Sequence, residues 1–90
     1  MDILNKVPIK SKFIARKEKD GYVIFNLETS GFHWLSKEAY EVLEKCDGSR
    51  SIKELALFFS KKKNEPVKRI EKQFCDFFKK LEERKLIKWK

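Results

Sequence analysis

In the first third of the chain, hydrophobic residues occur in short blocks between polar ones, a pattern that predicts strands. The basic segment 10–19 has an apolar centre and is expected to form the first strand. The Asp20-Gly21 pair is a strong hairpin signal, and the β-branched and aromatic run 22–27 predicts the second strand. After a turn, the apolar run 32–35 predicts a third strand. Together these segments indicate an antiparallel meander whose middle strand is 22–27.

From Ser36 onward, the spacing of the hydrophobic residues changes to that of amphipathic helices. Ser36 is a good N-cap for a first helix, which is expected to stop at Gly48. Ser51 and Glu54 form a capping box before a second helix, and Pro66 suits the first turn of a third. The positions expected to be buried are Ala39, Val42, Leu43 and Cys46 in the first helix, Ile52, Leu55, Ala56 and Phe59 in the second, and Val67, Ile70, Phe74, Phe77 and Leu81 in the third.

The order of these elements indicates an α+β fold, because strands and helices are segregated along the sequence. We expect a winged-helix-like arrangement in which an N-terminal three-stranded antiparallel meander is followed by a three-helix cluster. The chain has 90 residues and no long linker, so a single domain over 1–90 is expected. Residues 1–9 are expected to form a loose, flexible or strand-like arm. Residues 86–90 are expected to form either a short final strand or an ordered tail.

The composition is basic, since 22 Lys and Arg against 14 Asp and Glu give a formal net charge of +8. Such a charge favours acidic partners, although it can also serve solubility alone. No apolar run approaches the roughly 20 residues needed to span a membrane, so no membrane partner is expected. The first residues lack the long apolar segment and cleavage site of a signal peptide, which favours a cytoplasmic location.

Catalytic chemistry has little support in the sequence. The single histidine, His33, lies in an apolar strand, where a partly buried residue satisfied by its neighbours is expected. Cys46 and Cys75 fall within apolar helical patterns and are expected to be reduced core residues. No Cys or His pair has metal-ligand spacing, and no glycine-rich phosphate loop is present. We therefore expect a protein that is not an enzyme and needs no metal or cofactor.

The edges of the predicted sheet give the clearest functional signal. Both outer strands of a three-stranded meander are edges, and natural edges are commonly guarded by Lys or Pro. The segment 8–19 contains Pro8 and several basic residues, whereas 32–35 contains neither Lys nor Pro. An extended peptide is therefore expected to be able to add there as a fourth strand.

The alternation of the third strand divides its side chains between two faces. Leu35, directly before the helix cap, should face the helices, and His33 lies on the same side. Phe32 and Trp34 should then point to the other face. There they either pack against other apolar side chains of the sheet or form the contact of a homodimer.

The third helix has more apolar surface than a single seam requires, because it carries Cys75 and Phe78 beside the seam residues. Phe78 is expected either to widen the core face or to line a groove beside the sheet edge. Lys72 and Lys79 would then lie at the rim of that groove and attract acidic residues of a ligand.

The same helix offers an alternative function, that of a DNA-binding winged-helix regulator. The basic residues that would contact phosphates are Lys68, Arg69, Lys72, Lys79 and Lys80. However, the helix has only one Gln and no Asn to contact bases, and a winged helix normally has its hairpin after the recognition helix. Nucleic acid is therefore the alternative partner and not the expected one.

Three segments together carry a resemblance to a known family. They are DGYVIFNL (20–27), CDGSRSIKEL (46–55) and FFKKLEERKLI (77–87). Their order and spacing resemble those of the small PqqD-like peptide chaperones of pyrroloquinoline quinone biosynthesis and of the wider class of RiPP recognition elements. The resemblance covers roughly residues 13–87.

This resemblance implies a non-catalytic domain that binds the leader of a ribosomally synthesised precursor peptide. The leader would add as a strand beside the third strand, against the third helix. The domain would present it to a modifying enzyme such as a radical SAM enzyme, a cyclodehydratase or a lasso-type protease. The implied peptide-binding residues are Phe32, His33, Trp34 and Leu35 on the strand, with Lys72, Cys75, Phe78 and Lys79 lining the groove and Phe74 at its floor.

Overall fold

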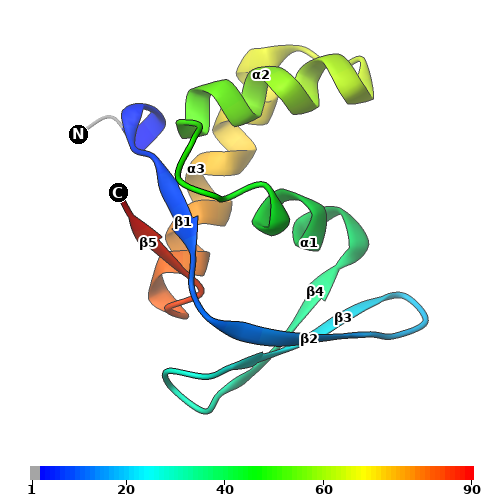
Figure 1. Cartoon of the computed structure of the whole chain (residues 1–90). Coiled ribbons are helices and arrows are strands. Elements are labelled where there is room, and N and C mark those ends of the chain that lie inside the picture. The colour runs from blue at the N-terminus through cyan, green and yellow to red at the C-terminus, as the bar shows by residue number, and fades with distance from the viewer. Residues whose placement is uncertain (1–2) are drawn as a thin grey trace.

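The computed structural model describes residues 3–90. Its elements follow in the order η1 (Ile3–Asn5), β1 (Pro8–Lys10), β2 (Phe13–Lys17), β3 (Gly21–Asn26), β4 (Phe32–Ser36), α1 (Lys37–Glu44), α2 (Ile52–Lys63), α3 (Val67–Glu83) and β5 (Ile87–Trp89). Figure 1 shows the meander of β2, β3 and β4 at the bottom of the view, with the helices above it. The predicted α+β fold, in which an antiparallel meander precedes three helices, is confirmed.

The meander has the strand order β2-β3-β4, so β3 is its central strand, as predicted. Phe13 pairs with Asn26 across β2 and β3, and Phe25 pairs with Phe32 across β3 and β4. Alternation gives the meander two different faces: Ile24 and Leu35 are buried beneath the helices, whereas Phe32 is exposed on the opposite face. The predicted division of the β4 side chains is therefore confirmed.

The two ends of the chain pair with each other, which local patterns do not reveal. β1 and β5 form a separate antiparallel sheet in which Pro8 lies opposite Trp89. The strand predicted over 10–19 is present as β2 but is shorter, and its first residue, Lys10, belongs to β1. The break between β1 and β2 includes Ser11, whose N–H donates to the Leu86 carbonyl at 2.9 Å. Residues 3–9 of the expected arm form η1 and most of β1, while residues 1–2 of that arm lie outside the described part.

The helix starts follow the capping signals. The Ser36 side chain accepts a hydrogen bond from the Ala39 N–H at 3.1 Å, and both bonds of the Ser51–Glu54 capping box are present. The end of α1 differs from the prediction, because the helix stops at Glu44. Gly48, with φ of +83°, instead turns the chain so that its N–H reaches the Pro8 carbonyl at 3.1 Å.

The core lies between the helices and the inner face of the meander, and it corrects the predicted seam of α3. Phe78 is fully buried, whereas Phe77 is only half-buried. Phe78 follows Phe74 by four residues and therefore lies on the same face of the helix, with ring centroids 5.5 Å apart. Phe78 thus widens the core and does not line a groove, while Phe77 lies at the margin of the buried stripe.

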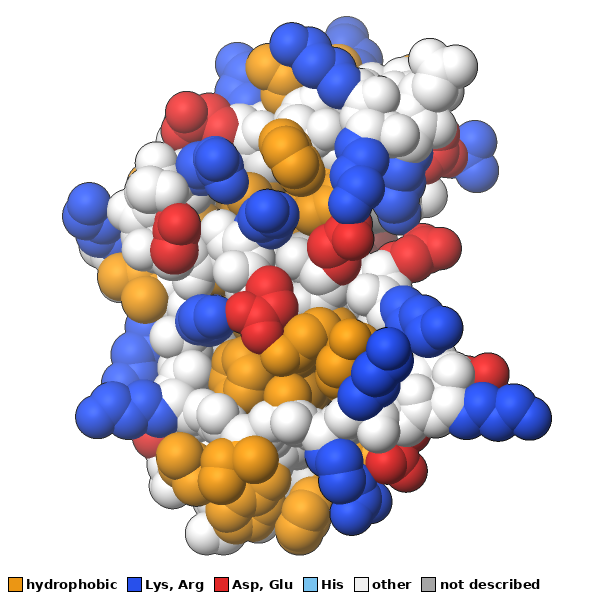
Figure 2. All heavy atoms as spheres, turned by 45° about the vertical axis from the view of Figure 1, so that its right-hand side comes forward, with side chains coloured by type: hydrophobic (Ala, Val, Ile, Leu, Met, Phe, Trp, Pro, Cys, Tyr) orange, Lys and Arg blue, Asp and Glu red, His pale blue; other side chains and the backbone are white. Residues whose placement is uncertain are grey.

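A concave surface lies between α1 and the β2 side of the meander. Tyr22 and Tyr40 stack there with ring centroids 3.8 Å apart, Phe13 packs edge-on against Tyr40, and the Lys10–Glu44 ion pair lies at its border. Figure 2 shows this side, where hydrophobic side chains fill a hollow at mid-height and charged side chains surround it. The lysines lining it are Lys10, Lys12, Lys17, Lys37, Lys45 and Lys62. The β2 edge is therefore lined with positive charge.

Within residues 3–90, no helix combines the length and the apolar composition needed to cross a membrane.

Candidate peptide-binding site

The free edge of the meander on the other side belongs to β4. In the part of the chain that the structure describes, β4 pairs with β3 alone. The Asn26 N–H donates to the Gly31 carbonyl at 2.8 Å, and bonded pairs alternate along an antiparallel ladder. Since the register pairs Ile24 with His33 and Tyr22 with Leu35, the backbone groups of His33 and Leu35 are directed at β3.

The same alternation fixes which backbone groups of β4 are available to a ligand. The residues between the bonded pairs, Phe32 and Trp34, direct their N–H and C=O groups toward the free edge. The expectation that residues 32–35 would all pair through their backbone with a peptide is therefore narrowed to these two. His33 and Leu35 instead contribute side chains to the face that meets the helices.

Two observations place parts of α3 near the two ends of β4. Near the start of β4, partial burial and the Arg84 guanidinium at the end of α3 lower the pKa of His33 below 6.5. Near the end of β4, Ser36 lines the same cleft as Phe74 and Phe77 from the middle of α3. A ligand strand on the β4 edge would therefore lie next to α3.

Asn26 holds this arrangement together. Its side chain is fully buried, and its amide NH₂ donates to the carbonyls of Arg84 and Lys85 at 3.1 and 3.0 Å. Its carbonyl oxygen accepts from the Glu28 N–H at 2.9 Å. One residue thus connects the meander turn with the end of α3. Sequence reasoning missed it, and the signal that could have found it is a polar residue at an inward position of a strand.

A cleft of about 220 Å³ lies between the start of α1 and α3. Small-molecule sites commonly measure about 300–1,000 Å³, so this cleft matches the side chains of a segment better than a cofactor. Phe74 and Val42 are buried in it, while Ala39 and Phe77 are half-buried. The lining residues are Ser36, Glu38, Ala39, Val42, Lys63, Gln73, Phe74 and Phe77.

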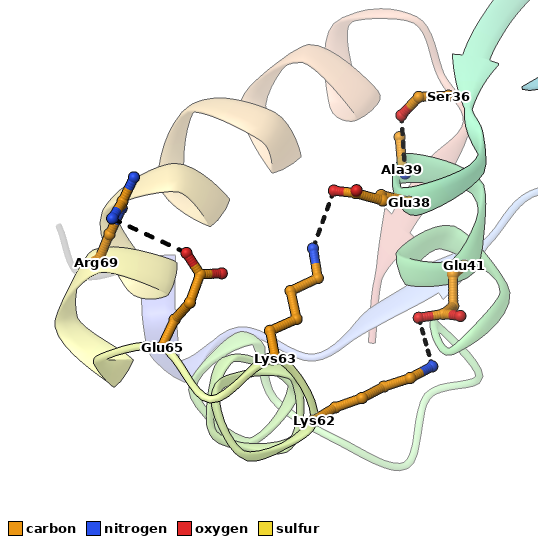
Figure 3. Close-up of polar contacts among 8 residues, drawn as sticks. All are labelled: Ser36, Glu38, Ala39, Glu41, Lys62, Lys63, Glu65 and Arg69. Carbon is orange, nitrogen blue, oxygen red and sulfur yellow. Dashed lines mark hydrogen bonds and ion pairs between the residues drawn. The ribbon is translucent and has the colours of Figure 1, made fainter. Parts of the chain in front are cut away.

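Charged residues form the rim of the cleft. Figure 3 shows Glu38 of α1 and Lys63 of α2 pointing toward one another, with 3.1 Å between carboxylate and ammonium. Glu41 and Lys62 make a similar contact at 2.7 Å, but these two residues line the concave surface with Tyr22 and Tyr40 and not this cleft. Exposed pairs of this kind add little stability, so the main effect of the Glu38–Lys63 pair is to place charged groups at the rim of the cleft.

Among residues 3–90, no three His, Cys, Asp or Glu side chains are grouped so that they could hold a metal ion. Burial raises the pKa of the Cys46 thiol to about 12, which keeps it protonated and unreactive. Cys75 is a free, half-buried thiol on α3.

A comparison with protein families agrees with this geometry. The family model described as Coenzyme PQQ synthesis protein D (PqqD) matches residues 21–87, from the start of β3 into β5. The chain belongs to the PqqD family. The match includes β4, α1 and α3, and therefore both sides of the cleft. No match is found among curated proteins or among solved structures.

PqqD-family proteins are non-catalytic accessory proteins that bind a precursor peptide and work with modifying enzymes. The resemblance stated above is thereby confirmed at the level of the family.

The structure brings only some of the expected helix residues to the cleft between α1 and α3. Phe74 lies in the cleft, as expected. Phe78 is fully buried, and Cys75 and Lys79 are each two residues from Phe77, about 200° around the helix. The expected rim residue Lys72 is likewise absent from the cleft lining.

Two cleft residues on α3 were not among the expected site residues, namely Gln73 and Phe77. Both flank the buried stripe on the side that faces α1. The spacing of apolar residues along α3 could not identify Gln73 and Phe77, because it does not indicate which margin of the buried stripe lies toward β4.

Proposed function

We propose that this PqqD-family chain recognises the leader of a ribosomally synthesised precursor peptide by strand addition at β4, against α3. The observation that carries the proposal is the placement of Phe32 and Trp34. Their outward backbone groups lie on an edge that is adjacent to a side-chain-sized cleft with Val42, Phe74 and Phe77 in its lining. Strand addition uses these two features together, since backbone bonds supply affinity and pockets supply specificity.

The added strand would present its side chains alternately to two sides. Those directed toward the helices would reach the cleft beside Ala39 and Phe77, which are half-buried and have room for a contact. Burial of one apolar side chain there is worth about 1.5–3 kcal/mol, so the cleft can discriminate strongly at one or two positions.

Basic side chains near the cleft would favour a leader with acidic residues. Lys63 lines the cleft, and Lys80 and Arg84 follow Phe77 by three and seven residues, which places them on the same side of α3. Complementary charge mainly raises the association rate and weakens with salt. We therefore assign specificity to the apolar contacts and speed of capture to the charges.

We further propose that the chain presents the bound leader to a modifying enzyme, of the radical SAM, cyclodehydratase or lasso-type protease class. The concave surface with Tyr22 and Tyr40 would stay accessible, because it lies on the β2 side of the meander and the leader on the β4 side. A delivery module requires two such separate surfaces.

The experiment is a titration of isotope-labelled protein with the synthetic leader encoded beside its gene. We expect the amides of residues 31–36 and 73–77 to shift, with a dissociation constant of about 10 µM or tighter. The matched control is a scrambled leader of the same composition and charge. If both peptides cause the same shifts and these vanish at physiological salt, only the +8 charge is being measured and the proposal is wrong.

The alternative expectation, a DNA-binding regulator, gains no support from the family match. A titration with duplex DNA under the same conditions separates the two functions. Sequence-specific affinity that survives physiological salt would favour the regulator.

A further inference from the structure

The outer face of the meander, turned away from the helices, carries an apolar group of its own. Its members are Ile14, Val23, Phe25, Phe32 and Trp34. Phe32 and Trp34, at the β4 edge, are 71% and 55% exposed. The cleft on the helix side does not use these two rings, so they form a separate surface next to it.

Both rings are held in place by β3. The Phe32 ring packs on Phe25 with centroids 4.9 Å apart. The Trp34 ring covers Gly21, where an added Cβ would overlap the Leu35 carbonyl oxygen and lie 2.7 Å from Trp34 Cζ2. Because Gly21 has no side chain, the indole of Trp34 can occupy this space. Side chains already fixed in this way lose little freedom when a ligand binds.

A strand added at β4 would bring half of its side chains to this face. Its backbone would bond to Phe32 and Trp34, whose N–H and C=O groups point to the free edge. Residues directly opposite in a ladder have side chains on the same face, with Cβ atoms about 4.5–5.5 Å apart. The peptide residues opposite Phe32 and Trp34 would therefore lie against the two rings, while the residues between them point to the cleft.

We propose that Phe32 and Trp34 form a second row of specificity-determining side chains, in addition to the cleft. This second specificity row selects apolar or aromatic side chains at alternate positions of the bound peptide. This inference rests on the proposed function and names its ligand class. The preferred ligand is a short segment that is apolar on both faces of the strand. A strand that is apolar only toward the cleft binds more weakly.

A peptide fits this surface better than a second copy of the chain does. The two rings are continuous with the β4 edge and the cleft, so one strand contacts all three. A stable dimer buries about 800 Å² and about 20–30 residues on each side, whereas the outer face offers five apolar side chains. Arg16, with a side chain 75% exposed, also lies on this face and would bring a charge into an interface between two copies.

The test uses peptides selected from a displayed random library of about 12 residues, longer than an ordinary strand, on the immobilised full chain. Affinities of the tightest peptide are measured for the wild type and for a variant with Phe32→Thr and Trp34→Thr. Threonine preserves strand propensity at both positions. We expect the double variant to bind about 3- to 30-fold more weakly. Ile14→Thr, on the same face at the far edge, is the matched control and should change affinity by less than about twofold.

The outcomes separate this inference from the proposed function. Equal affinity of the wild type and the double variant overturns the second specificity row and leaves strand addition intact. Failure of the wild type to enrich any peptide overturns the proposed function itself. Sedimentation equilibrium supplies a further check: a wild-type dimer that the double variant converts to monomer would assign the rings to a second copy and contradict the inference.

Discussion

Asn26 connects the meander to the end of α3 through its side-chain amide, so it determines whether the β4 edge and the cleft stay together. Its four main-chain partners lie in two segments far apart in sequence, and the side chain is fully buried. An inward polar residue in a small core is costly unless every bond is made.

We predict that Asn26→Ala lowers the free energy of unfolding by about 1–3 kcal/mol, because buried carbonyls lose their donor. Urea unfolding measures this change. Thr29→Ala is the matched control, since Thr29 Oγ1 accepts only an exposed bond from the Gly31 N–H in the same turn and its loss should cost about 0.5 kcal/mol or less. Equal losses in the two variants would contradict a special role for Asn26.

His33 reports on the distance between β4 and the end of α3. It is the single histidine of the chain, so its titration is resolved in a proton NMR spectrum. Partial burial and the Arg84 guanidinium lower its pKa below 6.5. We predict that Arg84→Gln moves this pKa upward but not fully to 6.5, because burial remains. Lys61→Gln on α2 removes the same charge and should leave the pKa of His33 unchanged.

The same shift predicts how stability depends on pH. Because the folded-state pKa of His33 is lowered, the unfolded chain binds this proton more readily. The stability contribution is complete above pH 6.5 and declines as pH falls through that value. Denaturation of the wild type at about pH 7.5 and 5.5 should show a larger loss than in His33→Gln. If the two proteins lose the same stability, the lowered pKa has no role in folding.

Within α3, the adjacent residues Phe77 and Phe78 have different structural roles. Phe78 lies in the core beside Phe74, and Phe77 lies in the cleft. We predict that Phe78→Leu lowers the free energy of unfolding by about 1–2 kcal/mol without changing the affinity for a bound peptide. Phe77→Leu should do the reverse, with a smaller loss of stability and weaker peptide binding.

The two variants serve as controls for each other, since the substitution is the same at neighbouring positions. Unfolding curves measure the free energy of unfolding of both variants, and peptide titrations measure their affinity. Loss of peptide affinity in Phe78→Leu alone would mean that the cleft is placed on the wrong side of α3.

Local signals in the sequence predicted most elements, because caps and turns act over a few residues. Ser36 and the Ser51–Glu54 box start their helices as expected. The seam of α3 was predicted less well, since Phe77 and Phe78 both fit a 3.6-residue repeat and only the direction of neighbouring elements decides between them.

The pairing of β1 with β5 could not be predicted, because it depends on contacts between the two ends of the chain. Pro8 faces Trp89, and the Lys90 N–H donates to the Val7 carbonyl at 2.8 Å. The free β4 edge could be predicted, because the absence of Lys and Pro from residues 32–35 is a local feature of the sequence. The outward direction of only Phe32 and Trp34 required the register.

The molecule divides its surface between a basic, aromatic side at β2 and an apolar edge at β4. This division predicts that Lys12→Gln with Lys17→Gln changes leader affinity by less than about twofold at physiological salt, because charges beyond a Debye length are screened. Calorimetric titration measures the affinity. A larger loss would place the leader on the β2 side, against the Tyr22 and Tyr40 surface.

Amide hydrogen exchange at β4 tests the central claim, strand addition, most directly. In the free protein, the amides of Phe32 and Trp34 should exchange quickly, while those of His33 and Leu35 are protected by β3. At saturating leader peptide, exchange at Phe32 and Trp34 should slow markedly and exchange at His33 and Leu35 should change little. Fast exchange at Phe32 and Trp34 in the saturated complex would contradict the account, because a bound strand cannot leave both of these amides open.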